Sequence, residues 1–280
     1  MKKIYYLICT MLLCSVMYGV QAQGIKMPQA SSSQTITQEF GLGKITLNYA
    51  RPNAKGRKIF GGLAPYGEVW RTGANTATTI AFTDDVTIEG NKVPAGEYAL
   101  FTIPGEKEWT IILNKTTKQW GAYEYKQADD FLRFKVKPVK SGEMIETFTI
   151  QFANVKPTTA EIQLLWEHTA VKLHLATDVD SRVMASIDEA MQGEKKPYFA
   201  AAQYYFENGK DLNKALVWIT EAEKSNPNAP YFKLWKARIQ LKMGNNAAAI
   251  ATAKEGARVA KEQKNEEYVR LNEALIAQAK

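Results

Sequence analysis

Residues 170–191 read AVKLHLATDVDSRVMASIDEAM and contain the point at which the hydrophobic pattern of the chain changes. Up to Leu175 the apolar residues alternate with polar ones, which is the period of a β-strand with one buried face. Beyond Asp178 they return at every third or fourth position, which is the period of an amphipathic helix. Asp178 and Asp180 stand where a helix start is expected. The sequence therefore predicts a β-domain over residues 34–176 and a helical domain over residues 177–280.

Upstream of this change the chain consists of short alternating segments separated by turn-forming residues such as Glu89-Gly-Asn91 and Pro94-Ala-Gly96. About ten short strands at this spacing predict an antiparallel sandwich or barrel. Three tryptophans in or beside these strands, Trp109, Trp120 and Trp166, are expected to pack in the core or at its rim. The predicted strands are residues 34–40, 44–50, 78–82, 85–89, 97–103, 108–113, 131–136, 145–152, 159–166 and 170–175.

Downstream, six helices are predicted over residues 182–191, 196–208, 211–224, 229–243, 246–261 and 265–279. A shift of about 34 residues carries Ala215 to Ala249 and Ala222 to Gly256, so small residues recur. This part resembles a tetratricopeptide-like array, in which small residues let paired helices approach closely. Such arrays present concave surfaces, which predicts binding of a protein or peptide partner. The candidate aromatic anchors are Tyr198, Tyr204, Tyr205, Trp218, Tyr231 and Trp235.

The N-terminus predicts export. Residues 1–22 combine a basic start, an uncharged apolar stretch and small residues before a cleavage site after Ala22, as in a secretory signal peptide. Residues 23–33 are expected to form a flexible leader. The two cysteines, Cys9 and Cys14, fall in the removed segment; lipidation of Cys14 is the alternative, although Leu13 is a poor neighbour for it. We therefore expect a periplasmic or envelope protein with no thiol and no transmembrane span in the mature chain.

Charge is uneven along the chain. Residues 23–191 carry 19 basic and 19 acidic residues, whereas residues 192–280 carry 15 basic and 10 acidic ones. A surplus of basic residues this small is typical of a solvated helical surface. The second interpretation is attraction to an acidic partner or to anionic lipid. Nucleic acid is disfavoured as a partner because the protein is expected outside the cytoplasm.

Residue types that carry catalysis or bind metals occur without a recognisable spacing. The two histidines, His168 and His174, would lie about 20 Å apart on an extended strand, too far to share a metal ion. Adjacent acids such as Asp84-Asp85 fall in predicted turns, where they usually bond their own backbone. The sequence therefore suggests no catalytic residue, metal or cofactor. A hydrolase acting on envelope glycans is the alternative, and it would need two carboxylates, or an acid plus His168, about 5–10 Å apart.

Residues 51–75 form an unusually long segment between two predicted strands. It holds five cations, three aromatic residues, two prolines and five glycines. Arginine can bind a carboxylate or phosphate with its planar fork, and aromatic rings can stack on a sugar. A carbohydrate or a small anionic ligand is one expectation; the other is a loop that covers the β-domain, with Phe60 and Trp70 plugging the core. The candidate ligand-binding residues are Arg51, Arg57, Lys58, Tyr66, Trp70, Arg71 and Asn75.

The same segment carries a family resemblance. The motifs KGRKIFG (55–61), VWRTGAN (69–75), FTIP (101–104) and WGAY (120–123) resemble a family of secreted bacterial proteins known as domain of unknown function 2911. The resemblance covers about residues 27–176 and implies an exported β-rich domain, sometimes followed by helical repeats. It implies no activity and no binding residue.

Together these features favour a non-catalytic binding or scaffold protein of the cell envelope. Its helical domain would recognise a protein or peptide. Its long loop offers the alternative site, for a glycan or small anion.

Overall fold

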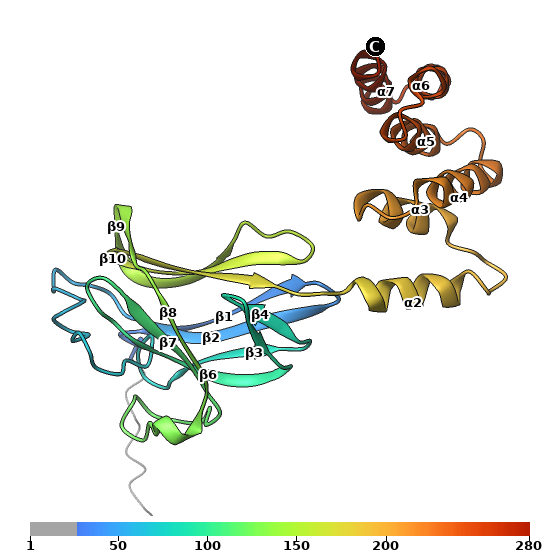
Figure 1. Ribbon diagram of the computed structural model, residues 1–280. Coiled ribbons are helices and arrows are strands. Elements are labelled where there is room, and N and C mark those ends of the chain that lie inside the picture. Colours follow the sequence, from blue (N-terminus) through green and yellow to red (C-terminus); the bar gives the residue numbers. More distant parts are fainter. Residues whose placement is uncertain (1–26) are drawn as a thin grey trace, which may run out of the picture. The chain divides into compact units, whose positions relative to one another are not determined.

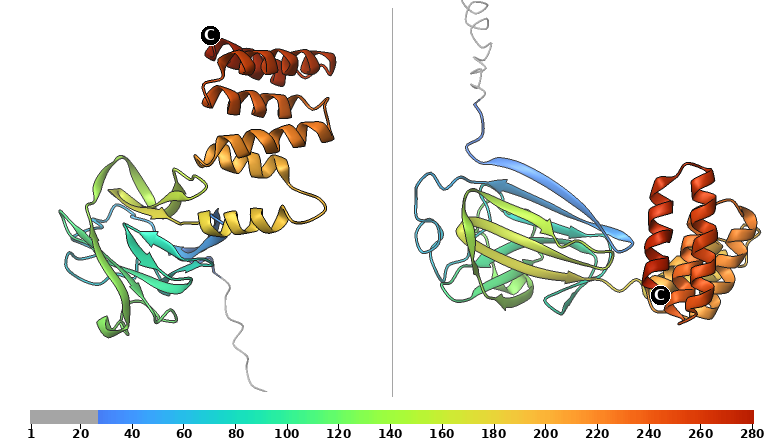
Figure 2. Two further views of the ribbon diagram at one scale, coloured as in Figure 1. Left: turned by 45° about the vertical axis from the view of Figure 1, so that its right-hand side comes forward. Right: turned by 90° about the horizontal axis from the view of Figure 1, so that it is seen from above.

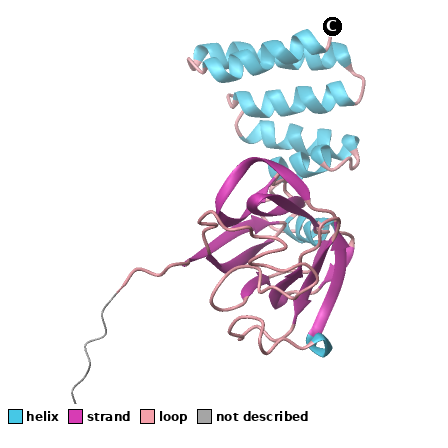
Figure 3. Ribbon diagram, turned by 90° about the vertical axis from the view of Figure 1, so that its left-hand side faces the viewer, coloured by secondary structure: helices cyan, strands magenta, loops and turns pink. Residues whose placement is uncertain are grey.

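The computed structural model of the protein describes residues 27–280 (Figure 1). The predicted signal peptide, its cleavage site after Ala22 and the first residues of the leader lie outside the described residues. The chain divides between Thr177 and Asp178 into two compact units. Strands make up the first and helices make up the second (Figure 3), which confirms the predicted β-domain followed by an α-domain.

The β-unit contains two antiparallel sheets. The larger has the order β1-β2-β3-β6-β7-β8 and the smaller the order β5-β4-β10-β9. The larger comprises β1 (Ser32–Phe40), β2 (Gly43–Arg51), β3 (Thr78–Phe82), β6 (Gly96–Ile103), β7 (Trp109–Asn114) and β8 (Asp130–Val136). The smaller comprises β4 (Val86–Ile88), β5 (Asn91–Val93), β9 (Val139–Ala153) and β10 (Thr159–Ala176).

The alternation in the sequence sets which side chains enter the core. In β2, Ile45 and Leu47 are buried whereas Thr46 between them is partly exposed. They join one apolar cluster with Ile150 of β9 and Leu164 of β10. Two separate sheets that share one core form a sandwich, which settles the choice between sandwich and barrel.

Three strands differ from the prediction. Strand β9 begins at Val139, six residues before the predicted segment 145–152. Residues 159–166 and 170–175 were predicted as separate strands, but they belong to one strand, β10. Glu167 has a φ of 54°, and the pairing with β9 shifts register on both sides of it. This irregularity interrupts the alternation that the prediction relied on. The three-residue strand β5 was not predicted because it is too short to show a period.

The helical unit contains α2 (Asp180–Ala190), α3 (Tyr198–Glu207), α4 (Leu212–Ser225), α5 (Pro230–Lys242), α6 (Asn246–Glu262) and α7 (Glu266–Gln278). Figure 2 shows α3 to α7 stacked in chain order. The side chain of Asp211 caps α4 by accepting from the amides of Asn213 and Lys214, and Pro230 begins α5. No helix among residues 27–280 has the length and apolarity needed to span a bilayer.

Candidate functional site

The long loop between β2 and β3 has an irregular backbone held by internal bonds. Lys55, Thr72 and Asn75 all have positive φ values, of 52°, 54° and 60°. For a β-branched residue such as Thr72 this is a true outlier, and strain of this kind gathers at functional sites. The buried Thr72 donates from Oγ1 to the Trp70 carbonyl at 3.3 Å and accepts at its own carbonyl from Thr78 Oγ1 at 2.6 Å.

Two consecutive side chains of this loop line one cavity. Trp70 and Arg71 would point to opposite sides of a regular strand, yet both line a cavity of about 310 Å³. Arg57 also lines it, so the structure brings together three of the seven predicted residues. The cavity is lined by Ala30, Ser31, Pro52, Asn53, Lys55, Arg57, Leu63, Trp70, Arg71, Gly73, Ala74 and Trp166.

The other four predicted residues lie outside this cavity. Arg51 is bonded internally, donating to the Phe148 carbonyl at 3.1 Å and to Thr149 Oγ1 at 2.7 Å. Asn75 donates to the Ser31 carbonyl at 3.3 Å. Lys58 is exposed, and the partly exposed Tyr66 ring packs over Gly61.

Two of the three aromatic residues of the loop, Phe60 and Trp70, pack into the sandwich. Phe60 is buried, and the rings of Trp70 and Trp166 stack with their centroids 5.7 Å apart. The Trp70 indole donates to the Gly73 carbonyl, and that of Trp166 donates to the Glu146 carbonyl, each at 3.1 Å. Both tryptophan N–H groups are therefore already paired inside the protein.

Arg71 differs from the other two loop arginines. Arg57 donates to the Asn53 carbonyl at 2.7 Å and to the Ala54 carbonyl at 3.0 Å, and Arg51 is held as described above. The guanidinium of Arg71 donates to no acceptor among the described residues, and its Nε is buried. A buried donor without a partner is costly and rare in native proteins.

Sequence reasoning missed nine of the twelve lining residues, and two of the nine, Lys55 and Trp166, have large functional side chains. Lys55 belongs to the KGRKIFG motif, and its positive charge was a signal that could have found it. Trp166 was assigned to the core, and it is only 1% exposed. It reaches the cavity wall from β10, far along the chain, so no local pattern could have linked it to the loop.

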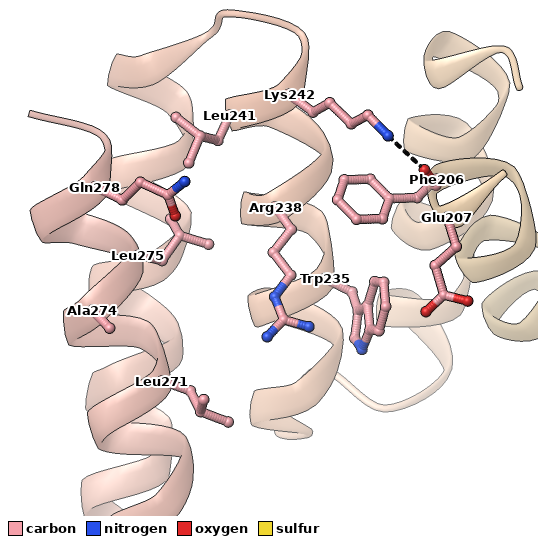
Figure 4. A pocket seen from close by; sticks show the side chains of 10 residues that line it. All are labelled: Phe206, Glu207, Trp235, Arg238, Leu241, Lys242, Leu271, Ala274, Leu275 and Gln278. Atoms are coloured by element: carbon pink, nitrogen blue, oxygen red, sulfur yellow. Dashed lines mark hydrogen bonds between the residues drawn. The ribbon is translucent and has the colours of Figure 1, made fainter. Parts of the chain in front are cut away.

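A second concave surface lies within the helical unit. A groove of about 670 Å³ is formed by the end of α3 together with α5 and α7. Figure 4 shows Arg238 and Trp235 on α5, with Trp235 on the side of Phe206 and Glu207 and the leucines of α7 on the other side. The groove is lined by Phe206, Glu207, Trp235, Arg238, Leu241, Lys242, Leu271, Ala274, Leu275 and Gln278.

The cations of this groove contact aromatic faces. The Arg238 guanidinium lies 4.9 Å from the Trp235 ring centroid and donates no hydrogen bond to residues 27–280. Lys242 lies over the Phe206 ring and donates to the Phe206 carbonyl at 2.7 Å. Of the six predicted aromatic anchors, Tyr205 and Trp218 are buried core residues, and Tyr198, Tyr204, Tyr231 and Trp235 are half-buried.

The hydrolase alternative required an acid close to His168, but the histidine that lies close to carboxylates is His174. His168 is exposed and has no hydrogen-bonding partner among the described residues. His174 instead lies between two carboxylates, with Nδ1 2.8 Å from Glu89 Oε1 and Nε2 3.6 Å from Glu161 Oε1. Hydrogen bonds from Gln163 and Asn154 hold the pKa of Glu161 below its usual range.

The lowered pKa of Glu161 does not suit this carboxyl to act as a general acid, because a general acid needs a raised pKa. The His174 side chain is also 67% exposed to solvent. No group of three or more His, Cys, Asp or Glu side chains in the described part of the chain is placed to hold a metal ion.

The exposed face of the larger sheet carries a third concavity, of about 510 Å³. Trp120 borders it and is 63% exposed, unlike the buried Trp109 and Trp166. The expectation that all three tryptophans pack in the core or at its rim therefore holds for two of them.

Comparison with known proteins finds one matching family model and no matching individual protein. The family model described as a protein of unknown function, DUF2911, matches residues 31–175. The match spans β1 to β10 and includes every residue of the loop cavity except Ala30. No curated protein and no solved structure matches the chain. Because the matched residues make up more than half of its length, the chain belongs to the DUF2911 family.

Proposed function

We propose that the chain is an exported, non-catalytic binding protein whose helical unit holds a segment of a partner protein in the groove between α3, α5 and α7. The observation that carries this proposal is an apolar groove whose central arginine, Arg238, donates no hydrogen bond to residues 27–280. Leu271 and Leu275 supply an apolar wall, and Arg238 has hydrogen-bond donors to spare.

Packing in the helical unit supports a tetratricopeptide-like array. Ala215, Ala222, Ala249 and Gly256, which correspond under the sequence shift, are all buried. A Cβ built on Gly256 would lie 2.5 Å from Asn272 Oδ1, so α6 and α7 approach closely at that point. Such arrays use the surface between their stacked helices for recognition.

The charge of the groove indicates which occupant fits. Arg238 and Lys242 face one acidic residue among the lining set, Glu207. Arginine binds a carboxylate through two parallel hydrogen bonds, and its stacking on Trp235 holds the guanidinium in place. The groove therefore suits a peptide segment that combines apolar side chains with an aspartate or glutamate.

A displayed peptide library selected on the mature protein tests this proposal. We expect enriched peptides to share apolar residues next to an acidic one and to bind with micromolar affinity. Ala274 is exposed on the groove wall, so Ala274→Trp fills the groove without disturbing the core. This change and Arg238→Glu should each weaken binding at least tenfold, about 1.4 kcal/mol.

Two exposed positions outside the groove provide matched controls. Arg270→Glu on α7 makes the same charge change, and Ala251→Trp on α6 makes the same steric change. Both variants should bind the selected peptides as the wild type does. Failure to enrich any peptide, or equal binding by the Ala274→Trp variant, would contradict the proposal.

Export to the periplasm or envelope is supported by the pattern of residues 1–22. Expression of the full chain in a bacterium should yield a protein that begins at Gln23, as measured by intact mass. A product that keeps residues 1–22 in the cytoplasmic fraction would refute this part of the proposal.

A further inference from the structure

We propose that the cavity under the long loop binds a small oxyanion, a phosphate or sulfate group, with Arg71 as its central ligand. The site lies in the β-unit and goes beyond the peptide recognition proposed for the helices. Lys55, Arg57 and Arg71 converge on it.

The electrostatics of the cavity favour a negatively charged ligand. Its lining includes three cations and no carboxylate. Glu146 contacts the lining without entering it: its Oε1 accepts from the Lys55 amide at 2.8 Å. Three clustered positive charges repel one another, and a doubly charged oxyanion would relieve that repulsion.

The hydrogen-bonding state of Arg71 points to the same ligand. Its Nε is buried and unpaired, and its guanidinium has no acceptor among the described residues. Arg51 and Arg57 in the same loop are both tied to backbone carbonyls. An oxyanion in the cavity would supply the acceptors that Arg71 lacks, through the charge-assisted bonds that guanidinium forms with phosphate.

The remaining lining explains why a charged group fits better than a neutral sugar. Both indole N–H groups are used internally, and Asn53 Oδ1 already accepts from Thr147 Oγ1 at 2.7 Å. Free cationic donors therefore dominate the site, whereas sugar hydroxyls need acceptors as well. The cavity volume of about 310 Å³ matches roughly ten water molecules, enough for an oxyanion and a small substituent.

The backbone around the cavity is fixed before any ligand arrives. Thr72 keeps its left-handed conformation through hydrogen bonds to Trp70, Thr102 and Thr78. Gly73 follows it, and a Cβ there would lie 2.9 Å from the Ala50 carbonyl oxygen. A site built this way loses little conformational entropy on binding.

Calorimetric titration of the mature chain with inorganic phosphate and with sulfate, at constant ionic strength, tests the proposal. Wild type should show saturable binding of at least one of them. Arg71→Gln should weaken that binding at least tenfold, and Lys55→Gln, at an exposed position, should weaken it severalfold. Lys58→Gln is the matched control, because Lys58 is an exposed cation of the same loop outside the cavity lining.

A sugar monophosphate and its parent neutral sugar distinguish the possible sources of the oxyanion. Tighter binding of the monophosphate would identify a phosphate ester as the ligand, and equal affinities would identify the free anion. No saturable binding of phosphate, sulfate or the monophosphate by wild type would overturn the proposal. A loss of anion affinity in the Lys58→Gln variant equal to that in Arg71→Gln would overturn it too. So would binding of the neutral sugar with the same affinity in wild type and Arg71→Gln. If the Arg71→Gln variant fails to fold, the anion affinities of Lys55→Gln and Lys58→Gln are compared instead. Weaker binding by Lys55→Gln alone supports the proposal, and equal affinities overturn it.

Discussion

Glu223 of α4 forms salt bridges to two lysines of α5. Its two carboxylate oxygens accept from Lys233 Nζ and Lys236 Nζ, each at 2.8 Å. The Lys233 side chain is only 9% exposed. A lysine this deeply buried is tolerated when it is paired, because burial of an uncompensated charge is costly.

Replacement of Glu223 should therefore destabilise the helical unit. We expect Glu223→Gln to lower its free energy of unfolding by about 1–3 kcal/mol, because Lys233 loses its charged acceptor. Glu221→Gln breaks an exposed pair with Lys224 in the same helix and should cost less than about 0.5 kcal/mol. Urea unfolding followed by circular dichroism at 222 nm measures both. Similar losses in the two variants would refute the special role of the buried pair.

The same pair predicts a dependence on pH. Burial opposes ionisation of Glu223, but hydrogen bonds from Lys233 and Lys236 outweigh it and hold its pKa below the usual range. The unfolded chain, with a glutamate pKa of about 4.3, thus takes up a proton before the folded chain does. The stabilisation is full above that pH and is lost as the pH falls through the lower, folded-state pKa. Wild type should lose stability between neutral and acidic pH more steeply than Glu223→Gln; parallel curves would contradict this.

At the scale of elements, the contact between α6 and α7 depends on the absence of a side chain. Gly256 is buried in α6, opposite the fully buried Asn272 of α7. Asn272 donates to the Tyr268 carbonyl at 2.8 Å, whereas its Oδ1 has no partner. In an exposed helix, replacing glycine by alanine stabilises by up to about 1 kcal/mol, so a loss here would show that packing overrides helix propensity.

Gly256→Ala should lower the stability of the helical unit by about 1–3 kcal/mol, since the new Cβ would meet Asn272 Oδ1. Asn272→Ala removes the obstructing atom. In that background Gly256→Ala should be neutral or stabilising, and a double-mutant cycle of unfolding free energies measures the coupling. If Gly256→Ala stabilises the otherwise unchanged protein, the two helices do not approach as closely as described.

At the scale of the whole molecule, the division between Thr177 and Asp178 predicts two unfolding events. Each unit has its own apolar core, so each should unfold cooperatively by itself. Ile80→Val in the sandwich core should lower the unfolding free energy of the β-unit by about 0.5–1.5 kcal/mol and leave that of the helical unit unchanged. Glu223→Gln should destabilise the helical unit and leave the β-unit unchanged. A single transition that both variants shift would show that the units unfold together.

The sequence by itself determined the order and type of nearly all elements, because alternation and three-to-four spacing are local properties of the chain. It located the division near residue 176 and singled out the loop over residues 51–75. It failed at Glu167, where one residue with a positive φ hides the continuity of β10. The surface pattern of a strand shows which face is buried, but it does not show the partner of that face.

Only the tertiary structure decided which loop residues work together. Arg51 and Arg71 look alike in sequence, yet the fold gives Arg51 a backbone carbonyl and a threonine hydroxyl as acceptors, whereas Arg71 has no acceptor among residues 27–280. It also brought Trp166 to the loop and joined α3, α5 and α7 around one groove. The physical reason is that pairing and burial depend on atoms distant in the chain, which no local period encodes.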